Sequence, residues 1–264
     1  MNKFLHFLSI TLLIISSVLL MALQIKLLGW LMLGLGAIAT LSSRDKEFRR
    51  NIILIYLAMV LLGAATISTS IESSHVWKMG PHLILALLLP YFISKYIYKN
   101  NLIHFTFSHE KKWQIKEIGY ILLTALLVYL FLPILLHLTN SYQNWTVEIN
   151  PGYLIAFFIG INAFGVYDEL FFMGTILRIL KNHLPYWAAN LTQSIIFTSF
   201  LYELGFRGFL FINIFIFAFL QGRIFYKTNS LFYLISIHLT ADFILYLALI
   251  HAYYPNLMPI FLIK

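Results

Sequence analysis

Three of the ten acidic residues of this chain lie deep inside long apolar segments, and this feature constrains the fold most strongly. Asp168 and Glu169 lie within GINAFGVYDELFFMGTIL, and Asp242 lies within LISIHLTADFILYLAL, four residues after His238. Ionisable side chains at such depth are costly in a bilayer, and they usually mark a reaction site or a proton pathway. The pattern therefore predicts a membrane protein with a site buried among its helices.

The composition supports this prediction, because 61% of the residues are hydrophobic, 11% are charged and the mean hydropathy is +0.84. Apolar runs near the roughly 20 residues needed to cross a bilayer recur along the chain, whereas alternating ten-residue strands do not. The expected fold class is all-α, a polytopic transmembrane helical bundle. The spans are expected near residues 4–24, 27–43, 51–70, 81–98, 117–139, 152–177, 185–203, 208–227 and 230–250. A short second span and an apolar tail at 257–263 leave the count at eight or nine membrane helices.

Basic residues gather on alternate connections, around residues 44–50, 95–116, 178–181 and 223–227. Positively charged loops of membrane proteins stay in the cytoplasm, so these connections are expected there. Because the net charge of +8 is spread over short loops rather than over one face, anionic membrane lipid is the expected partner. Nucleic acid is not expected as a partner. The chain has no cysteine, which excludes disulfides, a thiolate nucleophile and a cysteine-based zinc site.

The longest polar stretch, near residues 100–118, divides the chain into two expected parts. Residues 1–116 would hold N-terminal transmembrane helices and a cytoplasmic loop. Residues 117–264 would form a transmembrane core that carries the site. The chemistry is concentrated in this second part.

The two acidic motifs have spacings that allow them to meet. Asp168 and Glu169 point about 100° apart on a helix, so only one of them can aim squarely at a given partner. His238 and Asp242 are four residues apart and share a helix face. Glu169 and His238 each lie about nine residues, or roughly 13 Å, from the basic ends of their spans. Such a group can activate a water for hydrolysis, although buried acids can also join helices by hydrogen bonds or carry protons in a transporter.

The second half of the chain resembles the CPBP intramembrane proteases, which include CAAX prenyl endopeptidases and bacteriocin-processing or Abi proteins. That family has a Glu-Glu-x-x-x-Arg motif, a Phe-x-x-x-His motif and a His-x-x-x-Asn or Asp motif. Here DELFFMG begins at Asp168 and Glu169, and HLTAD runs from His238 to Asp242 after the lead-in QGRIFYKTNSLFYLISI. The likeness covers about residues 152–250.

The resemblance implies an intramembrane endopeptidase that cuts a peptide or protein tail, either prenylated or unprenylated, with carboxylate-activated water. Asp168, Glu169, His238 and Asp242 would be its catalytic residues. Asp168 or Glu169 would be the general base, His238 would orient water or stabilise charge, and Asp242 would set the His238 tautomer. It also implies a bacterial plasma membrane, with the site opening toward the cytoplasmic half.

Three positions depart from the family pattern. Leu201, in FTSFL, stands where the spacing from Glu169 places the motif histidine; Met173 replaces the arginine, and Asp168 replaces the first glutamate. The alternative interpretation is therefore a catalytically inactive relative that acts as a membrane scaffold or regulator.

A divalent metal such as zinc is an open alternative with poor support from the ligand count. Catalytic zinc usually takes three protein ligands and keeps one open position. His238 and Asp242 would need one further acid, and no H-E-x-x-H motif is present. No other cofactor is expected.

Overall fold

The structure is a computed structural model that describes residues 2–107 and 113–262, and every regular element in it is helical. The first half contains α1 (Asn2–Ser17) with η1 (Val18–Ala22), α2 (Lys26–Leu41), α3 (Lys46–Ala64) and α4 (Ser73–Phe92) with η2 (Ile93–Ile97). The second half contains α5 (Ile115–Leu138), η3 (Ser141–Asn144), α6 (Pro151–Asp168), η4 (Glu169–Leu177), α7 (Arg178–Leu180), α8 (Tyr186–Glu203), α9 (Phe209–Thr228) and α10 (Leu231–Tyr253). Each of the nine expected spans corresponds to a helical segment, and the apolar tail after Tyr253 is not helical in its described part.

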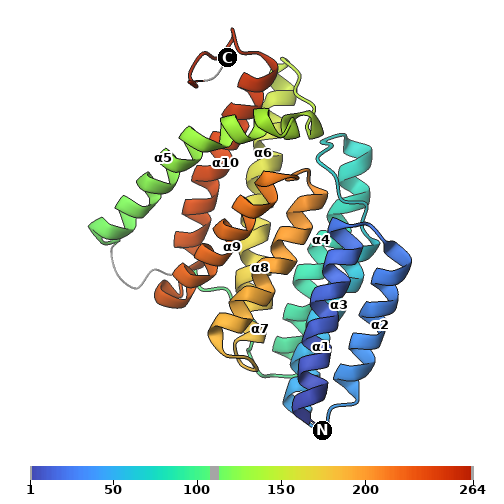
Figure 1. Cartoon of the computed structure of the whole chain (residues 1–264). Helices are drawn as coiled ribbons and strands as arrows, with labels where there is room; N and C mark the ends of the chain where they lie inside the picture. The colour runs from blue at the N-terminus through green and yellow to red at the C-terminus, as the bar shows by residue number, and fades with distance from the viewer. Residues whose placement is uncertain (1, 108–112, 263–264) are drawn as a thin grey trace.

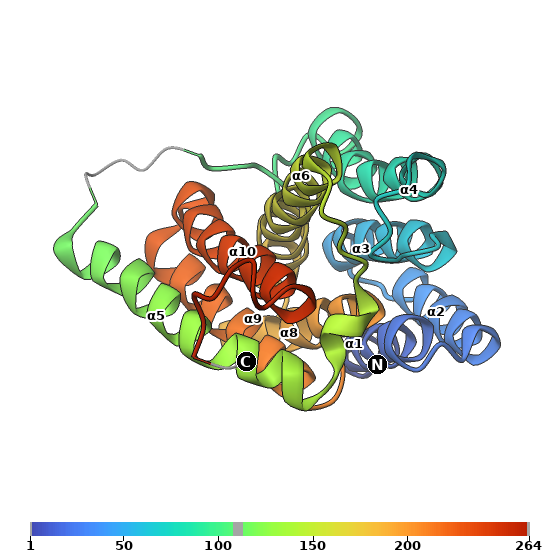
Figure 2. The ribbon, with the colours of Figure 1, turned by 90° about the horizontal axis from the view of Figure 1, so that it is seen from above.

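The helices form one bundle in which α6 and α8 lie between two groups (Figures 1 and 2). Seen from above, α1 to α4 gather on one side, while α9 and α10 lie on the other (Figure 2). The oblique helix α5 runs along the outside of α9 and α10 (Figure 2). The all-α polytopic prediction is therefore confirmed.

Six helical segments are long and apolar enough to cross a membrane: Asn2–Ala22, Ser73–Ile97, Ile115–Leu138, Pro151–Leu180, Phe209–Thr228 and Leu231–Tyr253. Helix α2 is apolar but shorter, and α3 and α8 are not among the six. Helix α3 begins with four charged residues in KEFRR. Helix α8 carries polar side chains that are buried against neighbouring helices, among them Asn190, Gln193 and Ser194. A helix whose polar face contacts protein rather than lipid does not need a uniformly apolar sequence.

Local signals set the start of both helices that carry the acidic motifs. Asn150 caps α6 by accepting hydrogen bonds from two backbone N–H groups of the first turn, and Pro151 follows at a position that needs no donor. The Ser230 side chain accepts from the Tyr233 N–H at the start of α10. These caps place Asp168 near the C-terminal end of α6 and His238 in the second turn of α10.

The expected basic connections meet at the end of the bundle that carries the N-terminus, here called the basic end (Figure 1). The Arg50 guanidinium donates to the Tyr98 carbonyl at 2.9 Å, and Asn51 lies 3.0 Å from the His183 ring. Residues 108–112, which include two of the predicted basic residues, lie outside the described residues. The connections at the basic end are thus held together by hydrogen bonds.

The opposite end of the bundle is formed by the connections 65–72, 139–150 and 204–208. The Thr69 hydroxyl donates to the Asn144 carbonyl at 2.6 Å, and the Asn144 amide donates to the Gly205 carbonyl at 2.9 Å. These bonds join three connections that are distant in the sequence.

Candidate active site

The acidic pair lies where the helical geometry changes. Helix α6 ends at Asp168, and the π-helical segment η4 begins at Glu169. Within it, the Thr175 hydroxyl donates to the Leu170 carbonyl five residues earlier, at 3.2 Å. Wider π-type turns often occur at functional sites, where they reorient side chains.

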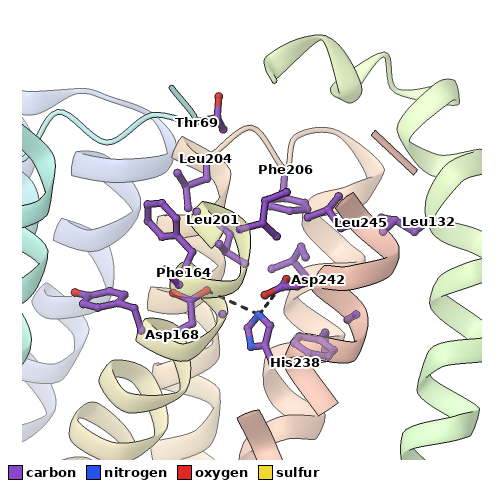
Figure 3. Close-up of a pocket in the computed structure, with 18 of the residues that line it drawn as sticks. Thr69, Leu132, Phe164, Asp168, Leu201, Leu204, Phe206, His238, Asp242 and Leu245 are labelled. Atoms are coloured by element: carbon purple, nitrogen blue, oxygen red, sulfur yellow. Dashed lines mark ion pairs between the residues drawn. The ribbon is translucent and has the colours of Figure 1, made fainter. Parts of the chain in front are cut away.

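The side chains of both motifs converge on the His238 ring, and all four are almost fully buried. His238 Nδ1 lies 2.7 Å from Glu169 Oε1. His238 Nε2 lies 4.0 Å from Asp168 Oδ2 and 3.8 Å from Asp242 Oδ1 (Figure 3). As predicted, the motifs meet at one depth, and only one member of the acidic pair contacts the ring directly. The Nδ1 partner is Glu169, whereas the sequence interpretation assigned the His238 tautomer to Asp242.

Gln221 of α9 is a further member of the cluster that the sequence interpretation missed. Its Nε2 donates to Glu169 Oε1 at 3.1 Å and to the Leu234 carbonyl at 3.4 Å. The signal was present, because the apolar stretch FINIFIFAFLQGRIF holds two amides, Asn213 and Gln221, but spacing does not show that Gln221 points toward Glu169. The Phe217 ring packs edge-on against His238, with 5.2 Å between the centroids. Glu169 and His238 are therefore held by α9 as well as by each other.

The cluster forms the floor of a cavity of about 660 Å³. Asp168, His238 and Asp242 line this cavity, while Glu169 lies behind the ring. Asp168 Oδ1 and Asp242 Oδ2 have no hydrogen-bond partner within the described part of the chain. Most other lining side chains are aliphatic or aromatic, such as Phe164 and Leu245 (Figure 3). Two carboxylates and an imidazole nitrogen thus face an apolar cavity together.

The motifs and the cavity floor fall inside a segment that matches a known family. Residues 150–244 match the family described as type II CAAX prenyl endopeptidase Rce1-like. This part of the chain is therefore Rce1-like. The match confirms the resemblance to CAAX-type proteases that the motifs predicted. Comparison with curated proteins gave no match. Comparison with solved structures also gave none.

The departures from the family pattern have clear positions in the Rce1-like segment. Leu201 of α8 lines the cavity near the cluster, where the motif histidine is expected. Met173 is buried in η4. Glu203, two residues beyond Leu201, pairs with Lys26 at 3.5 Å rather than with the cluster. A neighbouring acid therefore does not replace the missing histidine.

The cavity reaches the end of the bundle opposite the basic end. Its walls include Thr69, Trp145 and Phe206, which belong to the connections of the opposite end. Among the described residues, its lining includes none from the connections 42–45, 98–114 or 181–185. The cluster lies in the half of the bundle nearer the basic end, whereas part of the cavity lining belongs to the opposite end.

The donor set does not fit a metal centre. Among the described residues, no group of three or more His, Asp or Glu side chains is arranged to hold a metal ion. Glu169 is engaged with His238 Nδ1 at 2.7 Å and points away from the cavity face of the ring. The site residues therefore do not form a metal-ligand set.

Gly165 allows α6 and α10 to approach each other beside the cluster. A Cβ atom at this position would overlap the Asp242 carboxylate and lie 3.2 Å from the His238 ring. Gly165→Ala should therefore displace Asp242 and lower the thermal unfolding midpoint, because overpacking costs about 1–3 kcal/mol. This cost exceeds the roughly 0.5–1 kcal/mol gained from helix propensity.

Gly160→Ala on the same helix is the matched control, since its Cβ would meet only Ile71 at an ordinary 3.6 Å. The thermal unfolding midpoints of the two variants are measured in the same detergent and compared. Equal midpoints for the two variants would contradict the close approach at Gly165.

Proposed function

We propose that this protein is an intramembrane endopeptidase that cleaves a peptide or protein tail with carboxylate-activated water. The observation that carries the proposal is the convergence of Asp168, Asp242 and His238 Nε2 on one apolar cavity. The Rce1-like match of the same segment supports a protease of the CAAX type. The proposal includes both prenylated and unprenylated substrates.

The geometry suggests a division of roles within the cluster. Asp168 lines the cavity, and its Oδ1 has no hydrogen-bond partner among the described residues. In this proposal it is the general base that takes a proton from water. The resulting hydroxide attacks the scissile carbonyl, and the proton then passes to the leaving amine. His238 Nε2 orients the water or, when protonated, donates to the developing oxyanion.

Glu169 acts behind the ring in this proposal. Its contact with Nδ1 fixes the rotation and tautomer of His238, so that Nε2 points into the cavity. Gln221 holds Glu169 in turn. Asp242 flanks Nε2 on the other side and helps to position the water.

The membrane setting follows from the charge distribution. We place the basic end in the cytoplasm of a bacterial plasma membrane, in contact with anionic lipid. The connections at the basic end hold most of the described Lys and Arg residues, whereas Lys26 at the start of α2, Lys78 near the start of α4 and Arg207 lie toward the opposite end. This orientation puts the cluster in the cytoplasmic half of the bilayer. The division into residues 1–116 and a catalytic core at 117–264 is part of the same proposal.

A specific observation favours the inactive alternative. Leu201 lines the cavity at the position of the motif histidine, and its side chain can neither orient water nor accept a proton. A scaffold or regulator would keep the fold and the buried hydrogen bonds without hydrolysis.

Cleavage by purified protein in lipid vesicles separates the two functions. The assay uses a pool of prenylated and unprenylated membrane-proximal peptides, with wild type beside His238→Ala. We expect the wild type to release fragments that His238→Ala does not release. Equal fragment release by both proteins would reject the proposed site, and no release by folded wild type from any peptide would favour the scaffold.

A further inference from the structure

A second cavity lies at the end of the bundle opposite the basic end, apart from the acidic cluster. It has a volume of about 500 Å³ and is lined by the start of α2, the end of α3 with the connection after it, and the end of α8. We infer that this α2–α3–α8 cavity binds the headgroup of a zwitterionic phospholipid of the phosphatidylethanolamine class. The inference goes beyond the proposed function and does not depend on cleavage.

One ion pair supplies the charge of this cavity. Among the described residues, Lys26 and Glu203 are the charged side chains that line it. Lys26 Nζ lies 3.5 Å from Glu203 Oε1, which is longer than the roughly 2.7–2.9 Å of a strong hydrogen bond between charged groups. The Glu203 side chain is only 6% exposed, whereas that of Lys26 is 43% exposed. The pair therefore leaves a buried carboxylate that can accept from a ligand and a lysine that can turn toward an anion.

The cavity lies at the height where lipid headgroups meet acyl chains. Leu23, Ile25 and Leu27 surround Lys26 in the sequence, and they are 57%, 49% and 87% exposed. Exposed aliphatic side chains on a transmembrane bundle contact hydrocarbon. Trp30 lines the cavity, and tryptophan is enriched at the boundary between hydrocarbon and headgroups. A charged pair at this boundary has lipid headgroups as its neighbours.

Helix α2 offers a surface for the acyl chains of the same lipid. Leu27, Leu31, Leu35 and Ile38 are spaced by three or four residues, so they share one face of the helix. All four side chains are exposed. This apolar face begins one residue after Lys26, so a lipid whose headgroup occupies the cavity can lay its chains along α2.

The charges of the cavity select the headgroup. A headgroup that carries only a phosphate would bring a second negative charge beside Glu203, and like charges repel. A choline headgroup has a positive charge but no N–H group to donate to the carboxylate. The ammonium of ethanolamine has three N–H donors, as a lysine ammonium has. It can donate to Glu203 while the phosphate accepts from Lys26, so both charged side chains keep a partner.

Native mass spectrometry of the full chain in detergent tests this site. Wild type is incubated with equal amounts of phosphatidylethanolamine, phosphatidylcholine and phosphatidylglycerol that carry identical acyl chains. Glycerophosphoethanolamine, which has the headgroup without the chains, is added in a separate experiment. Glu203→Gln removes the carboxylate charge, and Ala64→Phe places a large side chain at an exposed position of the lining. Glu148→Gln is the matched control, because Glu148 is exposed at the same end and is not among the described lining residues.

We expect wild type and Glu148→Gln to retain phosphatidylethanolamine in preference to the other two lipids. Glu203→Gln should bind it about tenfold more weakly, the effect of losing one hydrogen bond to a charged group. Ala64→Phe should also lose the preference, which tests the cavity without altering its charges. Equal retention of the three lipids by wild type would overturn the inference, as would an unchanged preference in folded Glu203→Gln and Ala64→Phe. Equally tight binding of glycerophosphoethanolamine would overturn the assignment to a lipid.

Discussion

Replacing Asp168 by asparagine is expected to lower the cleavage rate by about two to four orders of magnitude, the usual contribution of a general base. Asparagine has nearly the same shape, but its amide cannot take a proton from water. Asp168 lines the cavity and its Oδ2 lies 4.0 Å from His238 Nε2, so the change removes the proposed proton acceptor from the floor of the cavity. Rates would be measured at saturating substrate in vesicles, with folding checked by thermal unfolding.

Asn213→Ala is the control, because Asn213 is a polar residue that lines the same cavity but lies outside the cluster. Among the described residues, Asn213 donates only to the Phe209 carbonyl of its own helix, at 2.9 Å. Its replacement should leave the cleavage rate nearly unchanged. An Asp168→Asn protein that cleaves as fast as Asn213→Ala would remove Asp168 from the mechanism.

Replacing Arg178 by alanine is expected to give the largest loss of stability, about 2–4 kcal/mol. Arg178 is buried, and the change removes its hydrogen bonds to His104, Thr106 and Asn229. Hydrogen bonds made by charged groups contribute about 1.5–3 kcal/mol. It also removes a side chain that fills the space over the Phe225 ring. The measurement is the thermal unfolding midpoint in detergent, and we expect a clear decrease.

Arg223→Ala on α9 is the matched control, because Arg223 is exposed near the same end of the bundle. Loss of an exposed arginine away from such contacts should change the stability by only a few tenths of a kcal/mol. If both variants unfolded at the same temperature, Arg178 would not hold the connections of the basic end together.

Much of the fold could be predicted because the bilayer demands long apolar helices. The nine expected spans correspond to helical segments, and the motif spacings placed the acidic residues near His238. Helices α3 and α8 show the limit of this reasoning, because their neighbours rather than lipid surround much of their surface. For such helices, the average hydropathy says little about position in the bundle.

The details of the site depended on contacts between distant helices, which spacing along one helix cannot give. Gln221 is 52 positions from Glu169, and only the rotation of α9 shows that they meet. The same applies to Arg178, whose partners His104 and Asn229 are 74 and 51 positions away. The residues that line the cavity are likewise set by packing between helices, which spacing along the sequence does not give.

The most direct test of a hydrolytic site on this cluster compares wild type with Glu169→Gln in the same lipid vesicles. Fragments from one membrane-embedded peptide would be identified by mass spectrometry during a single time course. Because Glu169 fixes the His238 ring through a 2.7 Å contact, wild type should cut at one defined bond and Glu169→Gln should release almost none of that fragment. Cleavage at the same bond and the same rate by folded Glu169→Gln would contradict the proposed site.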